Sequence, residues 1–351
     1  MGLKILHSAD WHLDSPFASF PEAQRTLLRR EQRKLPGKIA SFCRRAGCDL
    51  VLLAGDIFDG EAAPETVGLL KDALAECGVP VFIAPGNHDF CAPGSPWLEE
   101  VWPENVHIFT RGLESAAVPE LDCRVYGAGY QSMDCPPLLE GFQAGGTERY
   151  KVAVLHADPT VSNSPYCPVT GSQVRDSGLD YLALGHIHKA GGFRAGATLC
   201  AWPGCPMGRG WDETGEKGVC VVTLEDTPEV RAETLDTLRF WDMDVDVGAD
   251  AAEALSLVLP AAGNEDFYRI TLTGTGNPEI SELKKRFDAF PNLELRDKTE
   301  EPVDLWAGAG EDTLRGTFFR LLRQRSETDP HAVLAAEISR KLLEGKEVTL
   351  P

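Results

Sequence analysis

Short polar clusters follow hydrophobic, strand-like stretches at four places in this chain, and a single histidine ends a fifth stretch. The positions are Asp10-Trp11-His12, Gly55-Asp56, Gly86-Asn87-His88-Asp89, His156 and Gly185-His186-Ile187-His188. Open α/β sheets bind their ligands on the loops that follow the carboxyl ends of the strands. The sequence therefore predicts that oxygen and nitrogen donors from five separate segments meet in one pocket.

The hydrophobic stretches also indicate the fold class. Strands are predicted at residues 3–7, 50–53, 81–83, 152–156 and 181–184. They alternate with helical stretches around 21–46 and 64–77, and such alternation is typical of a layered α/β fold. Shorter strands between 197 and 247 are predicted to complete the second sheet of a β-sandwich core.

The length of 351 residues exceeds that of a typical domain, so we expect one large α/β domain with a smaller appendage. The predicted parts are a large domain at 1–249, a small αβ unit at 250–300 and a helical segment at 301–351. A polar linker at 297–302 precedes two amphipathic helices, 313–324 and 330–343. Helices this short are marginal alone, so they either fold onto the body or dock a partner.

Composition excludes some classes of protein. No apolar run approaches the roughly 20 residues that a membrane span needs, and the first residues lack the apolar region of a secretory signal. The ten cysteines contain no Cys-x-x-Cys pair, so we interpret them as small buried hydrophobes in a reducing compartment. We expect a cytoplasmic protein with no membrane contact.

Charge bears on the substrate. Lys plus Arg total 34 against 54 Asp plus Glu, a formal charge of −20. A free-standing nucleic-acid binder is normally basic, so this charge counts against unaided DNA binding. The stretch from Arg25 to Arg45 is locally basic, which fits either the solvated face of an amphipathic helix or a polarised binding surface.

The donor types point to a hydrolytic centre with two metal ions. A carboxylate that bridges two divalent ions lets both ions polarise one phosphate and activate one water. Asp56 is the best bridging candidate, because it is the lone carboxylate at its strand end. Mixed carboxylate, amide and imidazole donors suit Mn²⁺, Fe or Zn better than Ca²⁺. His88 points away from Asn87 and is expected to act as general acid or to orient the phosphate, with Asp59 fixing its tautomer.

Two further expectations concern these candidate ligands. Asp10 and His12 alternate by two, which places both side chains at one site if their loop is extended, and His186 and His188 do likewise. A closed structural zinc site is disfavoured, since it would use four ligands, chiefly Cys and His, without surplus carboxylates.

Five segments resemble the motifs of the calcineurin-like metallophosphoesterases. They are His7-Ser8-Ala9-Asp10-Trp11-His12-Leu13, Ala54-Gly55-Asp56-Ile57-Phe58-Asp59, Pro85-Gly86-Asn87-His88-Asp89, His156 and Leu184-Gly185-His186-Ile187-His188-Lys189. Within this family the chain resembles SbcD-type DNA repair exonuclease subunits, particularly their YhaO-like branch. Segments 13–17, 202–210 and 213–218 are similar to that branch rather than to SbcD proper. The resemblance implies a four-layer metallophosphoesterase β-sandwich flanked by helices, with a small αβ capping domain and C-terminal helices.

The resemblance also implies roles for individual residues. One ion would be held by Asp10, His12, Asp56 and His188, and the other by Asp56, Asn87, His156 and His186. Mn²⁺ would be the working metal and metal-bound hydroxide the nucleophile, while His88 would handle the leaving group or position the phosphate. The implied partners are DNA and an SMC-like coiled-coil ATPase of the SbcC or YhaN type, docked through the C-terminal helices. A homodimer is left open.

Three functions therefore compete. The first is a Mn²⁺-dependent DNA exonuclease or endonuclease in a repair complex regulated by an ATPase. The second is a hydrolase of small phosphodiesters or nucleotides on the same fold, which the acidic charge favours. The third is a non-catalytic scaffold, which predicts eroded ligands, yet none of the seven proposed ligands is missing.

Overall fold

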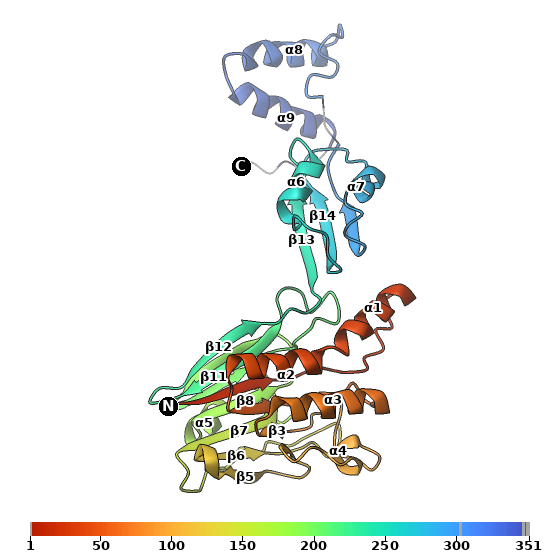
Figure 1. Cartoon of the computed structure of the whole chain (residues 1–351). Coiled ribbons are helices and arrows are strands. Elements are labelled where there is room, and N and C mark those ends of the chain that lie inside the picture. Colours follow the sequence, from red (N-terminus) through yellow and green to blue (C-terminus); the bar gives the residue numbers. More distant parts are fainter. Residues whose placement is uncertain (1, 302–303, 346–347, 349–351) are drawn as a thin grey trace. The chain divides into compact units, whose positions relative to one another are not determined.

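The computed structural model describes residues 2–301, 304–345 and 348. The chain divides into two compact units, each described here by itself (Figure 1). The first comprises Met1–Met243, Gly263–Arg269 and Ala289–Glu294, and the second comprises Asp244–Ala262, Ile270–Asp288 and Leu295–Pro351. All predicted site residues belong to the first unit. The last residue of the predicted linker, 302, lies outside the described residues. So do 303, 346–347 and 349–351 of the predicted helical segment.

One sheet of the first unit has the strand order β12-β11-β1-β2-β3-β4. Its strands are β1 (Leu3–Ser8), β2 (Leu50–Leu53), β3 (Val81–Ile83), β4 (Val106–Ile108), β11 (Gly218–Leu224) and β12 (Glu229–Thr234). Strands β1 to β4 are parallel, whereas β11 is antiparallel to both β1 and β12. The loops that follow β1, β2 and β3 therefore leave the sheet at the same edge.

The other sheet has the order β5-β6-β7-β8-β10-β9. Its strands are β5 (Glu114–Val118), β6 (Cys123–Gly127), β7 (Tyr150–His156), β8 (Tyr181–Gly185), β9 (Gly191–Ala195) and β10 (Thr198–Trp202). Strands β6, β7, β8 and β10 are parallel, and β5 and β9 pair antiparallel at the two edges. His156 is the last residue of β7 and His186 directly follows β8, so both lie at the carboxyl edge of this sheet.

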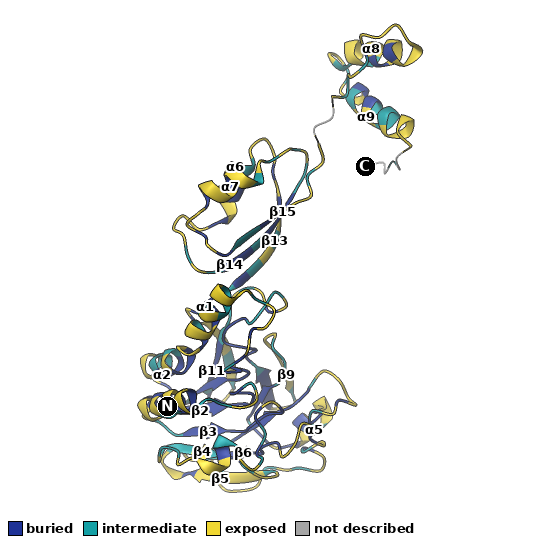
Figure 2. Cartoon of the chain, turned by 90° about the vertical axis from the view of Figure 1, so that its right-hand side faces the viewer, coloured by how far each residue is buried: buried dark blue, intermediate teal, exposed yellow. Residues whose placement is uncertain are grey.

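Alternate residues of the strands face different layers. In β2, Val51 and Leu53 pack with helices, while Leu50 and Leu52 pack in a second cluster with the other sheet. The helices of this unit are α1 (Glu22–Gln32), α2 (Leu35–Ala46), α3 (Pro64–Cys77), α4 (Pro96–Glu99), η1 (Pro119–Leu121) and α5 (Gly171–Asp176). Leu155 on β7 and Val174 on α5 belong to a third cluster, outside the second sheet. Two sheets packed face to face with helices outside confirm the predicted layered α/β sandwich, and Figure 2 shows buried residues concentrated in the strands.

The structure corrects two details. The stretch predicted as helical around 21–46 is two helices, because Pro36, in the first turn of α2, cannot continue a preceding helix. Strands β11 and β12 were expected in the second sheet, yet they extend the first one beside β1. Of the later strands predicted for the second sheet, β10 alone joins it among the described residues.

Glycine allows the two sheets to meet at the site. A Cβ added at Gly185, the end of β8, would lie 1.8 Å from the carbonyl oxygen of Ala54, which follows β2. A Cβ at Gly86 would lie 2.2 Å from Asp56 Oδ1. No larger residue fits at either position without displacing these loops, so the donors of both sheets come together because these positions lack a side chain.

A third sheet has the order β13-β14-β15, formed by Phe240–Asp246, Phe267–Thr273 and Leu293–Asp297. Helices α6 (Ala251–Val258) and α7 (Ile280–Arg286) accompany it, within the αβ unit predicted at 250–300. Helices α8 (Leu314–Ser326) and α9 (His331–Leu343) pack on each other through buried Phe319 and Ala336. Leu314 and Leu321 on α8, a helix predicted to be amphipathic, are 90% and 60% exposed.

Two expectations from composition can be compared with the structure. Among the described helices, none combines the length and the apolar character that crossing a bilayer requires. All ten cysteines lie within the described residues, where each is buried and free. Their predicted role as small buried hydrophobes is confirmed.

Candidate metal centre

The loops after β1 and β2 are joined by backbone hydrogen bonds. Asp10 N donates to Gly55 O at 3.0 Å, and His12 N donates to Asp56 O at 2.9 Å. These backbone bonds, without any side-chain contact, hold Asp10 and Asp56, the two predicted carboxylate ligands, close to each other. The loop after β1 is not extended as expected, because Asp10 and His12 have φ of 54° and 46°.

Left-handed backbone recurs at the predicted ligands. Asp56 and His186 also have positive φ, 49° and 88°. Residues with side chains in this region are strained by about 1–3 kcal/mol each and cluster at functional sites. Asp10 and His12 nevertheless lie in one group of potential ligand atoms, so the predicted convergence is found with a different local geometry.

Asp89 ties the loop after β3 to the loop after β2. Its buried carboxylate accepts hydrogen bonds from Gly86 N at 2.7 Å and from Ile57 N at 2.8 Å. Burial raises the pKa of this carboxyl to about 7, and the nearby Asp56 charge acts in the same direction. Asp89 was part of a predicted cluster without a role, and the structure shows that it holds two ligand loops together.

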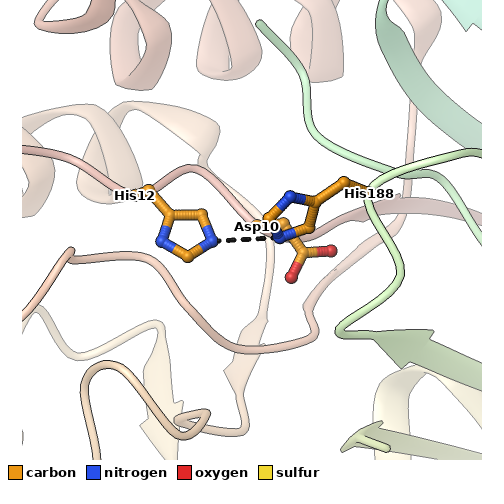
Figure 3. A group of neighbouring side chains, drawn as sticks. All are labelled: Asp10, His12 and His188. Carbon is orange, nitrogen blue, oxygen red and sulfur yellow. Dashed lines mark hydrogen bonds between the residues drawn. The ribbon is translucent and has the colours of Figure 1, made fainter. Parts of the chain in front are cut away.

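Asp10, His12 and His188 form the first group of potential ligands, with ligand atoms within 4.8 Å of one another (Figure 3). His12 Nε2 lies 3.2 Å from His188 Nε2. The Nδ1 atoms face carboxylates, since His12 Nδ1 lies 3.3 Å from Asp59 Oδ1 and His188 Nδ1 lies 2.6 Å from Glu213 Oε1. A neutral imidazole that donates from Nδ1 has a lone pair on Nε2, so two lone pairs face each other when both rings are neutral.

The carboxylate of Asp10 completes this group. Its Oδ1 accepts a hydrogen bond from His186 N at 3.0 Å. Its Oδ2 is buried and has no hydrogen-bond partner among the described residues. Burial raises the pKa of Asp10, against the effect of His156. An unpaired buried carboxylate oxygen is costly unless a cation meets it.

Asp10, Asp56 and His156 form a second group. His156 Nδ1 donates to Ala54 O at 3.0 Å, so Nε2 is the nitrogen that faces the other residues of the group. That Nε2 lies 2.9 Å from Asn87 Oδ1 and 3.3 Å from Asp56 Oδ2. Burial lowers the pKa of His156, but the Asp56 carboxylate outweighs it and the net pKa is about 9. The site therefore attracts a positive charge at this point.

His88 and Asp59 lie beside these groups. His88 Nδ1 lies 3.0 Å from Asp59 Oδ1, and the His88 side chain is 43% exposed. The contact with Asp59 raises the pKa of His88. Burial alone would raise the pKa of Asp59, yet its hydrogen bonds with His12 and His88 hold it well below the usual range. His88 also lies within ligand reach of His12 and Asp56, so its place outside the metal ligands stays a prediction.

His186 is the predicted ligand that joins no group of converging carboxylate and imidazole atoms within the described residues. Its ring centroid lies 5.2 Å from that of His156, and its Nε2 lies 4.0 Å from Asp158 Oδ2. Burial, with the nearby His156, lowers the pKa of His186 to about 4. The ring is therefore neutral and able to act as a ligand.

Sequence reasoning missed several residues that surround this centre. Asp158 lies two residues after His156, and that spacing could have drawn attention to it. Glu213 and Arg209 were noted only as part of similar segments, and no local spacing connects them with His188. Burial would raise the pKa of Glu213, but its hydrogen bond with His188 and the nearby Arg209 hold the pKa far below the usual range.

The residues present fit divalent cations. Polar atoms of both sheets converge here: the buried Nε2 of His12, the half-buried Nε2 of His188, the orphaned Asp10 oxygen, and the oxygens around His156 Nε2, a position whose raised pKa favours positive charge. Oxygen and imidazole donors of this kind suit Mn²⁺, Fe or Zn. The fold and this site define the class: a layered α/β protein with a candidate metal centre between the carboxyl edges of two sheets.

Comparison with known proteins gives the family. A family model described as calcineurin-like phosphoesterase matches residues 3–190, more than half of the chain. The chain belongs to the calcineurin-like phosphoesterase family, as its motifs indicated. Proteins of this family use divalent metals to hydrolyse phosphoesters, in agreement with the donor set described above.

The chain aligns with different shares of the length of individual related proteins. The chain is 35% identical over 245 residues to "Uncharacterized metallophosphoesterase YhaO" of Bacillus subtilis (strain 168), covering 63% of this chain and 57% of that protein, which is less than two thirds of its length. It is 29% identical over 332 residues to the D subunit of the SbcCD nuclease of Staphylococcus epidermidis, covering 83% and 84%. The solved structure of TT1561 of Thermus thermophilus matches at a TM-score of 0.42 and 14% identity, over 66% of this chain and 99% of that one.

Proposed function

We propose that this chain is a metal-dependent phosphodiesterase that cleaves DNA as the nuclease subunit of a repair complex with an SMC-like ATPase. One observation carries the hydrolytic part: imidazole nitrogens and oxygens from both sheets, buried except for half-buried His188, face one another at 2.9–3.3 Å around His12, His156 and His188. The nuclease part is supported by the likeness to a protein named as a nuclease subunit, aligned over most of both chains.

The proposed ligands divide between two ions. Asp10, His12, Asp56 and His188 would hold one, and Asp56, Asn87, His156 and His186 the other. His12 Nε2 lies 3.7 Å from Asp56 Oδ2, and His156 Nε2 lies 3.3 Å from the same oxygen. These distances support Asp56 as the shared ligand. We propose Mn²⁺ as the working metal, with Fe or Zn as alternatives.

When bound, two such ions would withdraw charge from a phosphate and lower the pKa of a water. The chain's own residues would do the rest. Asp59 contacts Nδ1 of His88, so Nε2 of His88 is the ring nitrogen available to the substrate. From there His88 would donate a proton to the leaving oxygen or hydrogen-bond a phosphoryl oxygen. Asp59 also contacts His12 Nδ1. One carboxylate therefore orients both the proposed acid, His88, and a proposed metal ligand, His12.

A second candidate is a hydrolase of small phosphodiesters or nucleotides. The formal charge of −20 favours it, because a surface of this sign repels a polyanion. An ATPase partner could supply the phosphate contacts that DNA binding needs. The two candidates share the metal centre and differ in the substrate.

A substrate panel separates the candidates. We expect the Mn²⁺-loaded protein with its ATPase to degrade duplex or single-stranded DNA ends, and the protein alone to cleave bis-p-nitrophenyl phosphate. Both activities should disappear with a chelator and return with Mn²⁺. Efficient cleavage of cyclic nucleotides together with untouched DNA ends, even when the ATPase is present, would favour the small-substrate enzyme.

We propose that residues 1–249 form the nuclease domain, 250–300 a capping domain and 301–351 the docking segment for the ATPase. The exposed face of α8 supports docking: Leu314, Phe318 and Leu321 are 90%, 42% and 60% exposed, although α8 packs on α9. We also place the protein in the cytoplasm, since ten buried free thiols are typical of a reducing compartment.

The docking proposal predicts a selective loss of association. Changing both Leu314 and Phe318 to Ser should abolish ATPase binding in a pull-down or by calorimetry, while hydrolysis of the chromogenic diester stays at the wild-type rate. A variant that ends at Pro302 should behave in the same way. Leu257 on α6 is 83% exposed, so Leu257→Ser is the matched control and should bind the ATPase normally. Normal association of the double variant would contradict the docking role.

A further inference from the structure

A buried carboxylate lies on the far side of His188 from the candidate metal centre. Glu213 is 6% exposed, and its Oε1 accepts a hydrogen bond from His188 Nδ1 at 2.6 Å. The other oxygen, Oε2, accepts a hydrogen bond from Arg209 N at 2.8 Å. Both oxygens are therefore engaged, and the carboxylate is fixed in position by the backbone of its own loop.

Arg209 joins this carboxylate to the one that holds His88. Its Nη2 donates to Glu213 Oε1 at 3.1 Å, and its Nη1 lies 3.9 Å from Asp59 Oδ2. The same Nη2 lies 3.2 Å from His188 Nδ1. His188 Nδ1 already donates to Glu213 Oε1. The short distance arises because the imidazole and the guanidinium both donate to this one oxygen atom.

We propose that Glu213 is the positioning residue of His188, and that Arg209 links it to Asp59 in one charged network behind three imidazoles of the centre. This inference rests on the proposed function, because the purpose of the arrangement is to present His188 Nε2 to a metal ion. Glu213 does for His188 what Asp59 does for His12 and His88.

Physical reasoning supports a role beyond stability. Burying charged groups carries a large desolvation cost, and a well-packed apolar cluster would stabilise the fold equally well. Hydrogen bonds to the second nitrogen of a ligating imidazole fix its tautomer and its ring orientation. Without Glu213, the His188 ring could place its proton on Nε2, the atom that faces His12 Nε2 at 3.2 Å.

The test compares Glu213→Ala and Glu213→Gln with wild type, and uses exposed Asp212→Ala as the neighbouring control. Calorimetric titration of the metal-free full-length protein with Mn²⁺ should show one of two ions bound about 10–100-fold more weakly in Glu213→Ala. Glu213→Gln should recover much of this loss, because its amide oxygen still accepts from Nδ1. Asp212→Ala should bind both ions normally.

A second readout needs no metal. ¹⁵N chemical shifts of the His188 ring in metal-free wild type should show the proton on Nδ1, whereas Glu213→Ala should show a mixture of tautomers. If wild type binds two ions, unchanged Mn²⁺ affinity and tautomer in a folded Glu213→Ala variant would overturn the positioning role alone. A wild-type protein that binds no divalent ion would instead overturn the proposed metal centre.

Discussion

Asp56→Asn should empty both metal positions and reduce hydrolysis of a chromogenic diester by about 10³-fold or more. The substitution keeps the size of the side chain and leaves an oxygen to accept the hydrogen bond from His88 N, which is 2.9 Å long. It removes the negative charge that faces both His12 and His156. Two cations would then share a site without their common anion. Metal content can be measured by mass spectrometry.

The matched control uses the other end of the same strand. Asp49 directly precedes β2 and accepts a hydrogen bond from Lys4 N at 2.9 Å. Asp49→Asn should keep two ions and full activity, and its melting temperature should rise on adding Mn²⁺ as in wild type, because a ligand that binds the folded state stabilises it. Two tightly held ions in Asp56→Asn would contradict the bridging role.

His88→Ala should reduce turnover by about 10²–10⁴-fold, the usual contribution of a positioned acid or base, while both ions stay bound. The physical reason is that Asp59 engages Nδ1 and more than two fifths of the side chain is exposed, so the ring faces substrate and solvent. The measurement pairs kcat for the diester with the metal content of the same preparation. Asp59→Asn should give an intermediate loss, because the ring would remain but its orientation would not be fixed.

His107 provides the control for this variant. It is exposed on β4 and contacts Phe82 and Phe109, so His107→Ala should leave turnover and metal content unchanged. The loss of one ion from His88→Ala would show that His88 is itself a ligand, an outcome that its distance to His12 and Asp56 permits. Together with Asp56→Asn, the variant separates loss of metal from loss of proton transfer.

The sequence predicted those elements of the fold that depend on local pattern. β2 and β3 were predicted at the residues where they occur, since a short run of apolar residues bounded by turns is typical of a strand covered on both faces. Strands β5 and β6 were not predicted. Their apolar residues are less regular, and β5 is mostly exposed at a sheet edge. The assignment of β11 to the first sheet depends on pairing with β1, a contact between distant segments.

Some residues of the candidate site could likewise be predicted from local sequence, and others could not. Its donors follow strands in recognisable clusters, so their participation could be inferred from order and residue type. Asp59 could be associated with His88 because it follows Asp56 closely, and the structure places the two in contact at 3.0 Å. Glu213 and Arg209 could not be found in this way. Their contacts with His188 exist only because the loop that follows β10 folds back beneath it.

The sequence by itself determined the layered α/β class, the family and the kinds of donor atoms that the centre contains, because hydrophobic period and residue chemistry are local properties. Only the tertiary structure decided which acceptor atoms face each other, which nitrogen of each imidazole is free, and which carboxylates lie behind them. Those features depend on the close approach of two sheets at Gly185 and Ala54. No local pattern encodes such an approach, because it results from the packing of the whole core.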